Sequence, residues 1–180
     1  MRIHIIGGQK DFYTSLIKSL KEIVNAEIVL CDKAEGADGI IVPGAHDLSN
    51  IDKKLEAIKY VRENGIPFLG ICFGHQLVCI EWARNVMGIK DAASEEFGKG
   101  TLVVKKRKEG LNVGIKKIGD RYESFWNNYE VREDIEKNFK EHCPPTMLTS
   151  QFHPEYESSK ENPHPLLLKF IEIICKKIIR

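Results

Sequence analysis

The stretch that decides the fold of this chain is Gly65-Ile66-Pro67-Phe68-Leu69-Gly70-Ile71-Cys72-Phe73-Gly74-His75-Gln76. Its first half contains a short apolar run, Pro67 to Ile71, which is bounded by glycines and is typical of a buried strand. From Gln76 onward the apolar residues recur at helical spacing as far as Met87. We therefore predict a strand that turns directly into a helix, with Cys72 at the junction.

Glycines stand two residues before and two residues after Cys72, so Gly70-x-Cys72-x-Gly74 has the pattern of a nucleophile elbow. A sharp elbow forces its central residue into strained backbone angles, and only glycine leaves enough space on either side. The turn also places the sulfur at a helix N-terminus, where the helix dipole stabilises negative charge. The alternative is a structural cysteine buried in a glycine-rich connection, because free cysteines are commonly hydrophobic core residues.

A second motif, Ser150-Gln151-Phe152-His153-Pro154-Glu155, follows another apolar run far downstream. Residues two apart share one face of an extended segment, so His153 and Glu155 can point the same way. A histidine oriented by a carboxylate is the general base that a cysteine nucleophile needs. A single His-x-Glu is weak evidence, but its combination with the elbow predicts a catalytic triad of Cys72, His153 and Glu155.

These two motifs resemble the signatures of the class I glutamine amidotransferases, which hydrolyse glutamine with a Cys-His-Glu triad. The resemblance covers most of the chain and is closest to the glutaminase domain of CTP synthase. It is very specific between Asp38 and Phe97, where the matching segments include Asp38 to Gly44, Ala57 to Asn64 and Ala83 to Ala92. It implies an α/β fold with a flavodoxin-like, mainly parallel sheet and helices on both faces. It also implies glutamine as the substrate, with no cofactor and no metal for its hydrolysis.

The resemblance implies further site residues. The backbone N–H of Phe73 and the loop at Gly44 and Ala45 would form the oxyanion hole, although this chain has Ala45 where the family has a second glycine. Gln76 and Glu96 would help to position the substrate. Glu96 stands where the family has a carboxylate that holds the α-amino group of glutamine.

The segment 120–131 departs most from the family. CTP synthases carry an arginine- and histidine-rich stretch there, from which an arginine contacts the carboxylate of glutamine, whereas this chain has Ser124-Phe125-Trp126-Asn127-Asn128. Loss of a charged partner for a bound carboxylate costs roughly 1.5–3 kcal/mol. Arg121 is a candidate substitute, although nothing in the sequence shows that it reaches the site. Phe125 and Trp126 are expected to pack in the core or at its rim.

The alternation of apolar strand patterns with helical ones also predicts a parallel sheet covered on both faces. Strands are expected at residues 2–6, 27–31, 39–42 and 67–71, and helices at residues 11–24 and 51–64 and after Pro163. Ligands bind beyond the carboxyl ends of such strands, so Gly44, Cys72 and His153 would share one crevice.

The remaining expectations concern the second half of the chain. Its pattern predicts a hairpin between residues 100–107 and 111–118 and a loop over residues 132–146. His142 and His164 are expected to face solvent.

The composition sets broad limits. A chain of 180 residues predicts one domain spanning residues 1–180, and the net charge of +1 gives no electrostatic basis for binding nucleic acid or a membrane. No apolar run approaches the roughly 20 residues that cross a bilayer. The 5 cysteines are scattered without a Cys-x-x-Cys pair, which suits a reducing compartment and argues against a disulfide framework or a zinc site. We expect a cytoplasmic protein.

Three functions are compatible with the sequence. CTP synthase joins its glutaminase domain to an ATP-dependent synthetase domain, but no G-x-x-x-x-G-K-[S/T] loop occurs here. The first function is a glutaminase that hands ammonia to a separate synthetase chain. The second is a stand-alone hydrolase of glutamine or another γ-glutamyl compound, and the third is a catalytically silent binding or regulatory module. The complete triad favours an enzyme, whereas Ala45 and the missing arginine favour the last two.

Overall fold

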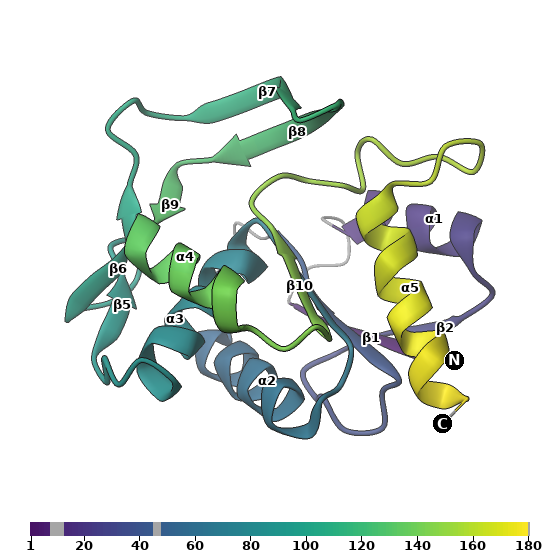
Figure 1. Ribbon diagram of the computed structural model, residues 1–180, viewed down its shortest axis with the longest axis horizontal. Helices are drawn as coiled ribbons and strands as arrows, with labels where there is room; N and C mark the ends of the chain where they lie inside the picture. Colours follow the sequence, from purple (N-terminus) through teal and green to yellow (C-terminus); the bar gives the residue numbers. More distant parts are fainter. Residues whose placement is uncertain (8–12, 45–47, 180) are drawn as a thin grey trace.

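The computed structural model describes residues 1–7, 13–44 and 48–179 (Figure 1). Its central layer is a five-stranded sheet in the order β10-β4-β3-β1-β2, and all of its pairings are parallel. The strands are β1 (Arg2–Ile6), β2 (Glu27–Cys31), β3 (Gly39–Val42), β4 (Phe68–Ile71) and β10 (Met147–Ser150). This parallel sheet confirms the predicted α/β fold class.

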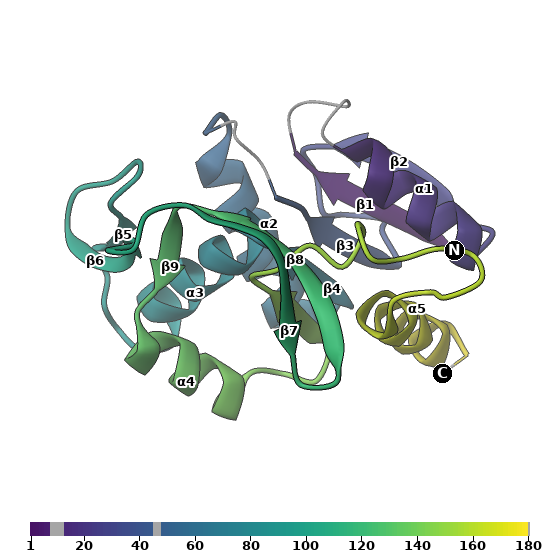
Figure 2. The same ribbon diagram turned by 90° about the horizontal axis from the view of Figure 1, so that it is seen from above.

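Helices cover both faces of the sheet (Figure 2). Their bounds are α1 (Thr14–Ile23), α2 (Ile51–Asn64), α3 (Phe73–Asn85), α4 (Glu133–His142) and α5 (Pro165–Ile178). Successive strand residues alternate between two hydrophobic cores, because side chains of a strand point to opposite faces. Ile41 and Leu69 pack with α1 and α5, whereas Ile40 and Phe68 pack with α2 and α3. The site therefore rests on a sheet that is buried on both sides.

The predicted hairpin between residues 100–107 and 111–118 is wrong. β6 (Thr101–Lys106) pairs with β5 (Ala92–Ser94) and β9 (Tyr129–Val131) instead. β7 (Asn112–Ile118) pairs with β8 (Arg121–Asn127), so that Ile118 lies opposite Arg121. Only Gly119 and Asp120 connect these two strands, and Gly119 has a φ of 58°. Two-residue turns with positive φ match the twist of a hairpin, which explains why this shorter connection is the one that closes.

The loop predicted over residues 132–146 is also wrong, because it contains α4. Three acidic residues, Glu133, Asp134 and Glu136, lie in the first turn of α4, where they complement the helix dipole. Ile135 and Phe139 are four residues apart and buried on the face that packs against α3.

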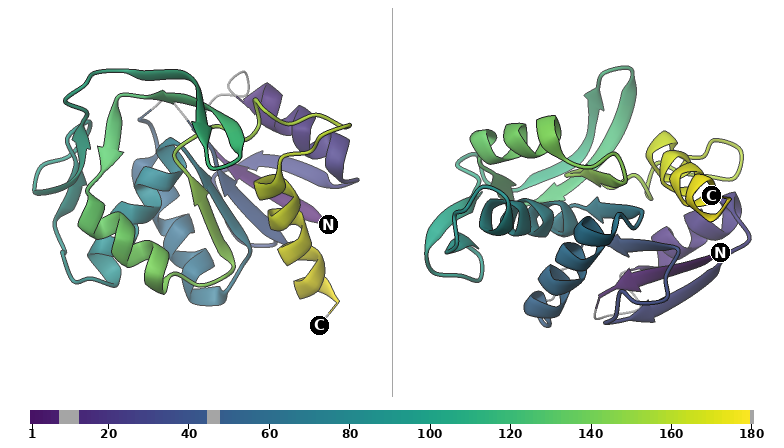
Figure 3. Two further views of the ribbon diagram at one scale, coloured as in Figure 1. Left: turned by 45° about the horizontal axis from the view of Figure 1, so that its top comes forward. Right: turned by 60° about the horizontal axis from the view of Figure 1, so that its bottom comes forward.

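His164 is buried, contrary to expectation, whereas His142 is exposed as expected. The Nδ1 of His164 accepts a hydrogen bond from the N–H of Leu166 at 3.1 Å. The Nε2 of His164 therefore carries the proton, and it donates to the carboxylate of Glu123 at 3.0 Å. Burial lowers the pKa of His164 despite the opposing effect of Glu123. This pair ties the β7–β8 hairpin to the start of α5 (Figure 3).

Among the helices of the described segments, the longest have 14 residues, and none is long and apolar enough to span a bilayer.

A first prediction concerns His75, which is buried in α3. Its Nε2 lies 3.6 Å from Glu136 Oε1, and its Nδ1 has no hydrogen-bond partner within the described ranges. Burial lowers the pKa of His75 to about 4, against the effect of Glu136 and together with that of Lys140. As the pH falls, the His75 imidazole therefore takes up a proton near pH 6.5 in the unfolded chain but only near pH 4 in the folded chain. We expect the free energy of unfolding to fall by roughly 3 kcal/mol between these pH values on account of His75.

Urea denaturation at pH 7.5 and pH 4.5 measures this effect. His75→Leu should reduce the loss of stability in acid, and it should change stability little at pH 7.5 because a buried unpaired nitrogen is removed. His142→Leu on the exposed side of α4 is the matched control. Equal acid sensitivity of the His75→Leu variant and the unaltered protein would contradict this account.

Candidate active site

Cys72 lies at the junction of β4 and α3 with an unusual backbone conformation. Its φ is 52° and its ψ is −102°, and among the described non-glycine residues only Asn50 shares a positive φ. Such angles are costly and persist only where the surrounding structure enforces them. The backbone N–H of Cys72 donates to the carbonyl oxygen of Ser150 at 2.7 Å, which ties the junction to the end of β10.

Close packing accounts for both flanking glycines. A Cβ on Gly74 would lie 1.9 Å from the carbonyl oxygen of Val42 at the end of β3. A Cβ on Gly70 would lie 3.0 Å from the backbone of Gly74. The first turn of α3 therefore rests directly on the sheet, so a side chain is excluded at residue 74 and would be tightly packed at residue 70.

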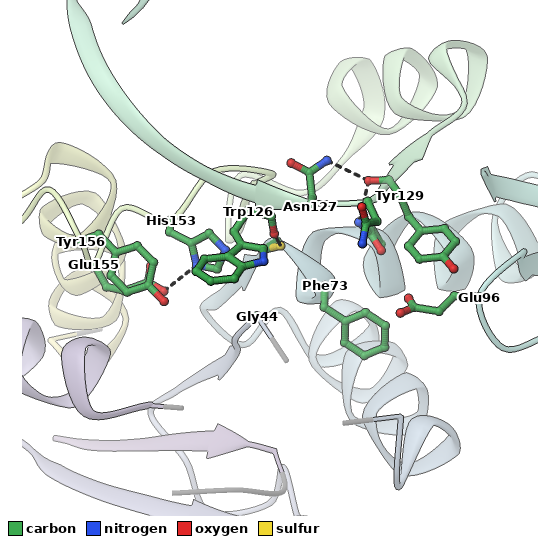
Figure 4. Close-up of a pocket in the computed structure, with 12 residues that line it drawn as sticks. Gly44, Phe73, Glu96, Trp126, Asn127, Tyr129, His153, Glu155 and Tyr156 are labelled. Atoms are coloured by element: carbon green, nitrogen blue, oxygen red, sulfur yellow. Dashed lines mark hydrogen bonds and ion pairs between the residues drawn. The ribbon is translucent and has the colours of Figure 1, made fainter. Parts of the chain in front are cut away.

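His153 and Glu155 follow β10 and form a hydrogen-bonded pair (Figure 4). His153 Nδ1 lies 2.9 Å from Glu155 Oε1, and each residue is only 7% exposed. The ring of Tyr156 stacks on that of His153, with 4.9 Å between their centroids. The other carboxylate oxygen, Glu155 Oε2, has no partner in the part of the chain that the structure describes.

Cys72 and His153 meet beside Gly44. A Cβ placed on Gly44 would lie 2.7 Å from His153 Cε1 and 3.3 Å from Cys72 Cβ. Burial alone would lower the pKa of His153, but hydrogen bonds to Cys72 and Glu155, together with their negative charges, raise it to about 10. The imidazole is thus stabilised in its protonated form between a sulfur and a carboxylate.

A cavity of about 220 Å³ opens above these residues. It is lined by Gly44, Cys72, Phe73, Gln76, Glu96, Trp126, Asn127, Asn128, Tyr129, His153, Glu155 and Tyr156. Its volume suits a small substrate, because pockets for drug-sized ligands start at about 300 Å³. The structure thus brings Gly44, Cys72 and His153 into one crevice beyond the strand ends.

The other site residues suggested by the sequence lie in different surroundings. Phe73 contributes the first N–H of α3, and Glu96 lines the cavity half-buried, so that burial raises its carboxyl pKa. Gln76 Nε2 donates to the carbonyl oxygen of Tyr129 at 3.1 Å and lies 3.3 Å from Gln151 Oε1. Ala45 lies outside the described residues.

Arg121 does not line the cavity. Its Nε lies 3.7 Å from Glu123 Oε1, on the side of the hairpin that faces His164. Phe125 packs against Phe152 as expected, with ring centroids 6.1 Å apart.

The sequence did not indicate that Trp126 and Gln151 lie next to the sulfur of Cys72. The carbonyl oxygen of Trp126 and the side-chain nitrogen of Gln151 each lie 3.5 Å from Cys72 Sγ. Trp126 is 53% exposed and stands at the rim of the cavity. The one indication in the sequence that Trp126 belongs to the site was its position in the segment 120–131, which departs from the family. In the described ranges, no group of three or more His, Cys, Asp or Glu side chains is arranged to hold a metal ion.

Known proteins resemble this chain over nearly its whole length. The family described as glutamine amidotransferase class-I matches residues 9–173. CTP synthase of Encephalitozoon cuniculi is 32% identical over 229 aligned residues, and that of Methanoculleus marisnigri is 33% identical over 223. These alignments cover 93% and 94% of this chain but only 42% of each relative, so the chain spans less than half of their length.

A solved structure agrees with these relatives. The glutaminase domain of Trypanosoma brucei CTP synthase, solved with bound acivicin, superimposes with a TM-score of 0.77 at 26% identity. The superposition covers 98% of this chain and 94% of that domain. The chain therefore belongs to the class I glutamine amidotransferase family and resembles the glutaminase domain of CTP synthase.

Proposed function

We propose that this chain hydrolyses the side-chain amide of glutamine, with Cys72 as the nucleophile. His153 acts as the acid and base, and Glu155 orients its ring. The observation that supports this role most directly is the contact of His153 with both Cys72 and Glu155 beside an open cavity. A nucleophile, a base and an orienting group in hydrogen-bond contact are the arrangement that acyl transfer requires.

In the first step, the Cys72 thiolate attacks the amide carbon, and the amide oxygen takes up the negative charge. The N–H of Phe73 stands at the start of α3, where helix amides have no intrahelical acceptor, and is available to this oxygen. The loop at Gly44 and Ala45 supplies the second donor in this proposal. Loss of one such donor costs roughly 3–4 kcal/mol of transition-state stabilisation.

In the second step, the C–N bond breaks, and His153 gives its proton to the departing ammonia. The product on the enzyme is a thioester between the γ-carbonyl group and Cys72. The neutral His153 then removes a proton from water, which attacks the thioester and releases the carboxylate and the Cys72 thiolate. Glu155 keeps the ring in place through both proton transfers.

We further propose that a separate synthetase chain accepts the ammonia. The support is the resemblance to the glutaminase domain of CTP synthase, which covers 93% of this chain and 42% of the relative. Glutamine hydrolysis as such needs no partner.

Labelling of Cys72 tests the proposed nucleophile. The diazo-ketone analogue of glutamine should alkylate Cys72, and mass spectrometry of the digested protein locates the adduct. Cys72→Ala should abolish the adduct and lower glutamate release by at least about 10³-fold, because the covalent route is lost. Cys31→Ala, which removes a partly exposed thiol, is the control and should behave like the unaltered protein. An adduct on Cys31 with Cys72 unmodified would refute the assignment.

Gly44→Ala tests the contact between the two reacting groups. The added Cβ would lie 2.7 Å from His153 Cε1, so it should displace the ring and lower kcat by about 10²-fold. Gly65→Ala is the matched control, because Gly65 has a φ of 59° and open space around its Cα. That control should lose roughly 1 kcal/mol of stability and keep its activity. Equal activity losses in the two variants would indicate general destabilisation instead.

The pH profile tests the role of His153 as an acid. Because its pKa is raised to about 10, kcat/KM should be maintained at neutral pH and fall as the pH rises through about 10. The stability that this proton confers is likewise complete below pH 6.5 and lost as the pH rises toward 10. Glu155→Gln should move the alkaline fall in kcat/KM toward neutral pH, whereas Glu161→Gln on the surface should not. If the alkaline fall in kcat/KM stays at the same pH in Glu155→Gln, Glu155 does not raise the pKa of the catalytic acid.

A further inference from the structure

The described lining of the cavity beyond Cys72 offers no free cation to a carboxylate. Among its described lining residues, His153 is the one cationic side chain, and it is already engaged by Cys72 and Glu155. Glu96 places a second carboxylate in the same lining. A substrate carboxylate would therefore enter without a charged partner and close to a like charge, which is unfavourable in a partly desolvated site.

The neutral hydrogen-bond donors of the cavity are largely used within the protein. Gln76 Nε2 and Asn127 Nδ2 both donate to the carbonyl oxygen of Tyr129, at 3.1 and 2.9 Å. The carbonyl oxygen of Trp126 faces Cys72 Sγ at 3.5 Å. The end of β8 thus presents the carbonyl oxygen of Trp126 at the site, and this oxygen repels an anion and attracts a donor. Asn128 is exposed in this lining and offers a neutral amide.

The end of the cavity near Glu96 suits an ammonium group. Figure 4 shows the Glu96 carboxylate near the rings of Phe73 and Tyr129. Burial, followed by the charge of Glu96, raises the pKa of the Tyr129 hydroxyl, as expected for groups that lie close together. A carboxylate beside aromatic rings attracts a cation through both its charge and the ring quadrupoles.

We propose that the preferred substrate is a glutamine whose α-amino group is free and whose α-carboxyl group is neutral, as in an α-amide. This inference rests on the proposed function and specifies its substrate. Glu96 holds the ammonium group, and the neutral α-amide lies at the end of β8, where it donates to the carbonyl oxygen of Trp126. Water then replaces ammonia on the γ-carbonyl carbon: one C–N bond breaks, one C–O bond forms, and no oxidant or reductant takes part.

Binding to the Cys72→Ala variant tests this preference without turnover. Isothermal titration should give a Kd at least tenfold lower for L-glutaminamide than for L-glutamine. The carboxylate of glutamine loses its hydrogen bonds to water without gaining a charged partner, and the neutral α-amide avoids this cost. The dipeptide L-glutaminyl-glycine is the third probe. If it binds as well as glutaminamide, the substrate class extends to N-terminal glutamine residues, and if only glutaminamide binds tightly, the class is limited to small amides. N-acetylglutamine, which lacks the ammonium group, should bind most weakly.

Two substitutions in the same Cys72→Ala background identify the groups responsible. Asn128→Arg adds a cation to the lining and should shift the glutamine-to-glutaminamide affinity ratio by at least tenfold toward glutamine. Asn162→Arg makes the same charge change on an exposed turn and should leave the ratio unaltered. Glu96→Gln should weaken the binding of glutamine and glutaminamide alike, because both carry the ammonium group.

The inference is overturned if glutamine binds as tightly as either α-amide, or if no probe binds. Its failure differs from that of the proposed function. Cys72 labelled by the diazo ketone, together with a preference for free glutamine, would remove only the α-amide preference. Cys72 left unlabelled by both the free acid and the α-amide of the diazo ketone would remove the glutaminase itself.

Discussion

The carbonyl oxygen of Val42 sets the constraint on which the site depends, because the first turn of α3 rests directly against it. A side chain at residue 74 would collide with this oxygen at 1.9 Å, so the helix can take this position only with glycine there. The contact fixes the start of α3 relative to the end of β3. It thereby places Cys72 beside Gly44, where His153 arrives from the segment after β10.

The central layer could be predicted because short, mainly apolar runs alternate with helical patterns, which leaves few structural alternatives. The strands at residues 2–6, 27–31 and 39–42 have the expected bounds, and the strand expected at 67–71 begins one residue later. The candidate residues Cys72, His153 and Glu155 could be named for a similar reason. The spacing of Gly70, Cys72 and Gly74 has a geometric meaning, and so does that of His153 and Glu155.

The second half of the chain was harder to predict because its local patterns fit several pairings. The segments 100–107 and 111–118 both alternate loosely, and this alternation does not specify which strands pair. His164 and Glu123 are polar and far apart in the sequence, so nothing local indicates that they are buried together. The hydrogen bonding of Gln76 has the same origin, because its acceptor is the carbonyl oxygen of Tyr129, which is far away in the sequence.

The position of β10 at the edge of the sheet has a consequence for the order of folding. β10 pairs only with β4 in this sheet, and it brings together segments that are far apart along the chain. Contacts of such long sequence separation form late, because a large loop must be closed first. A shift of one residue in this pairing would also turn every side chain of the strand to the opposite face. We therefore expect the imidazole to reach the sulfur late in refolding, after the strands and helices that lie closer together in the sequence have formed.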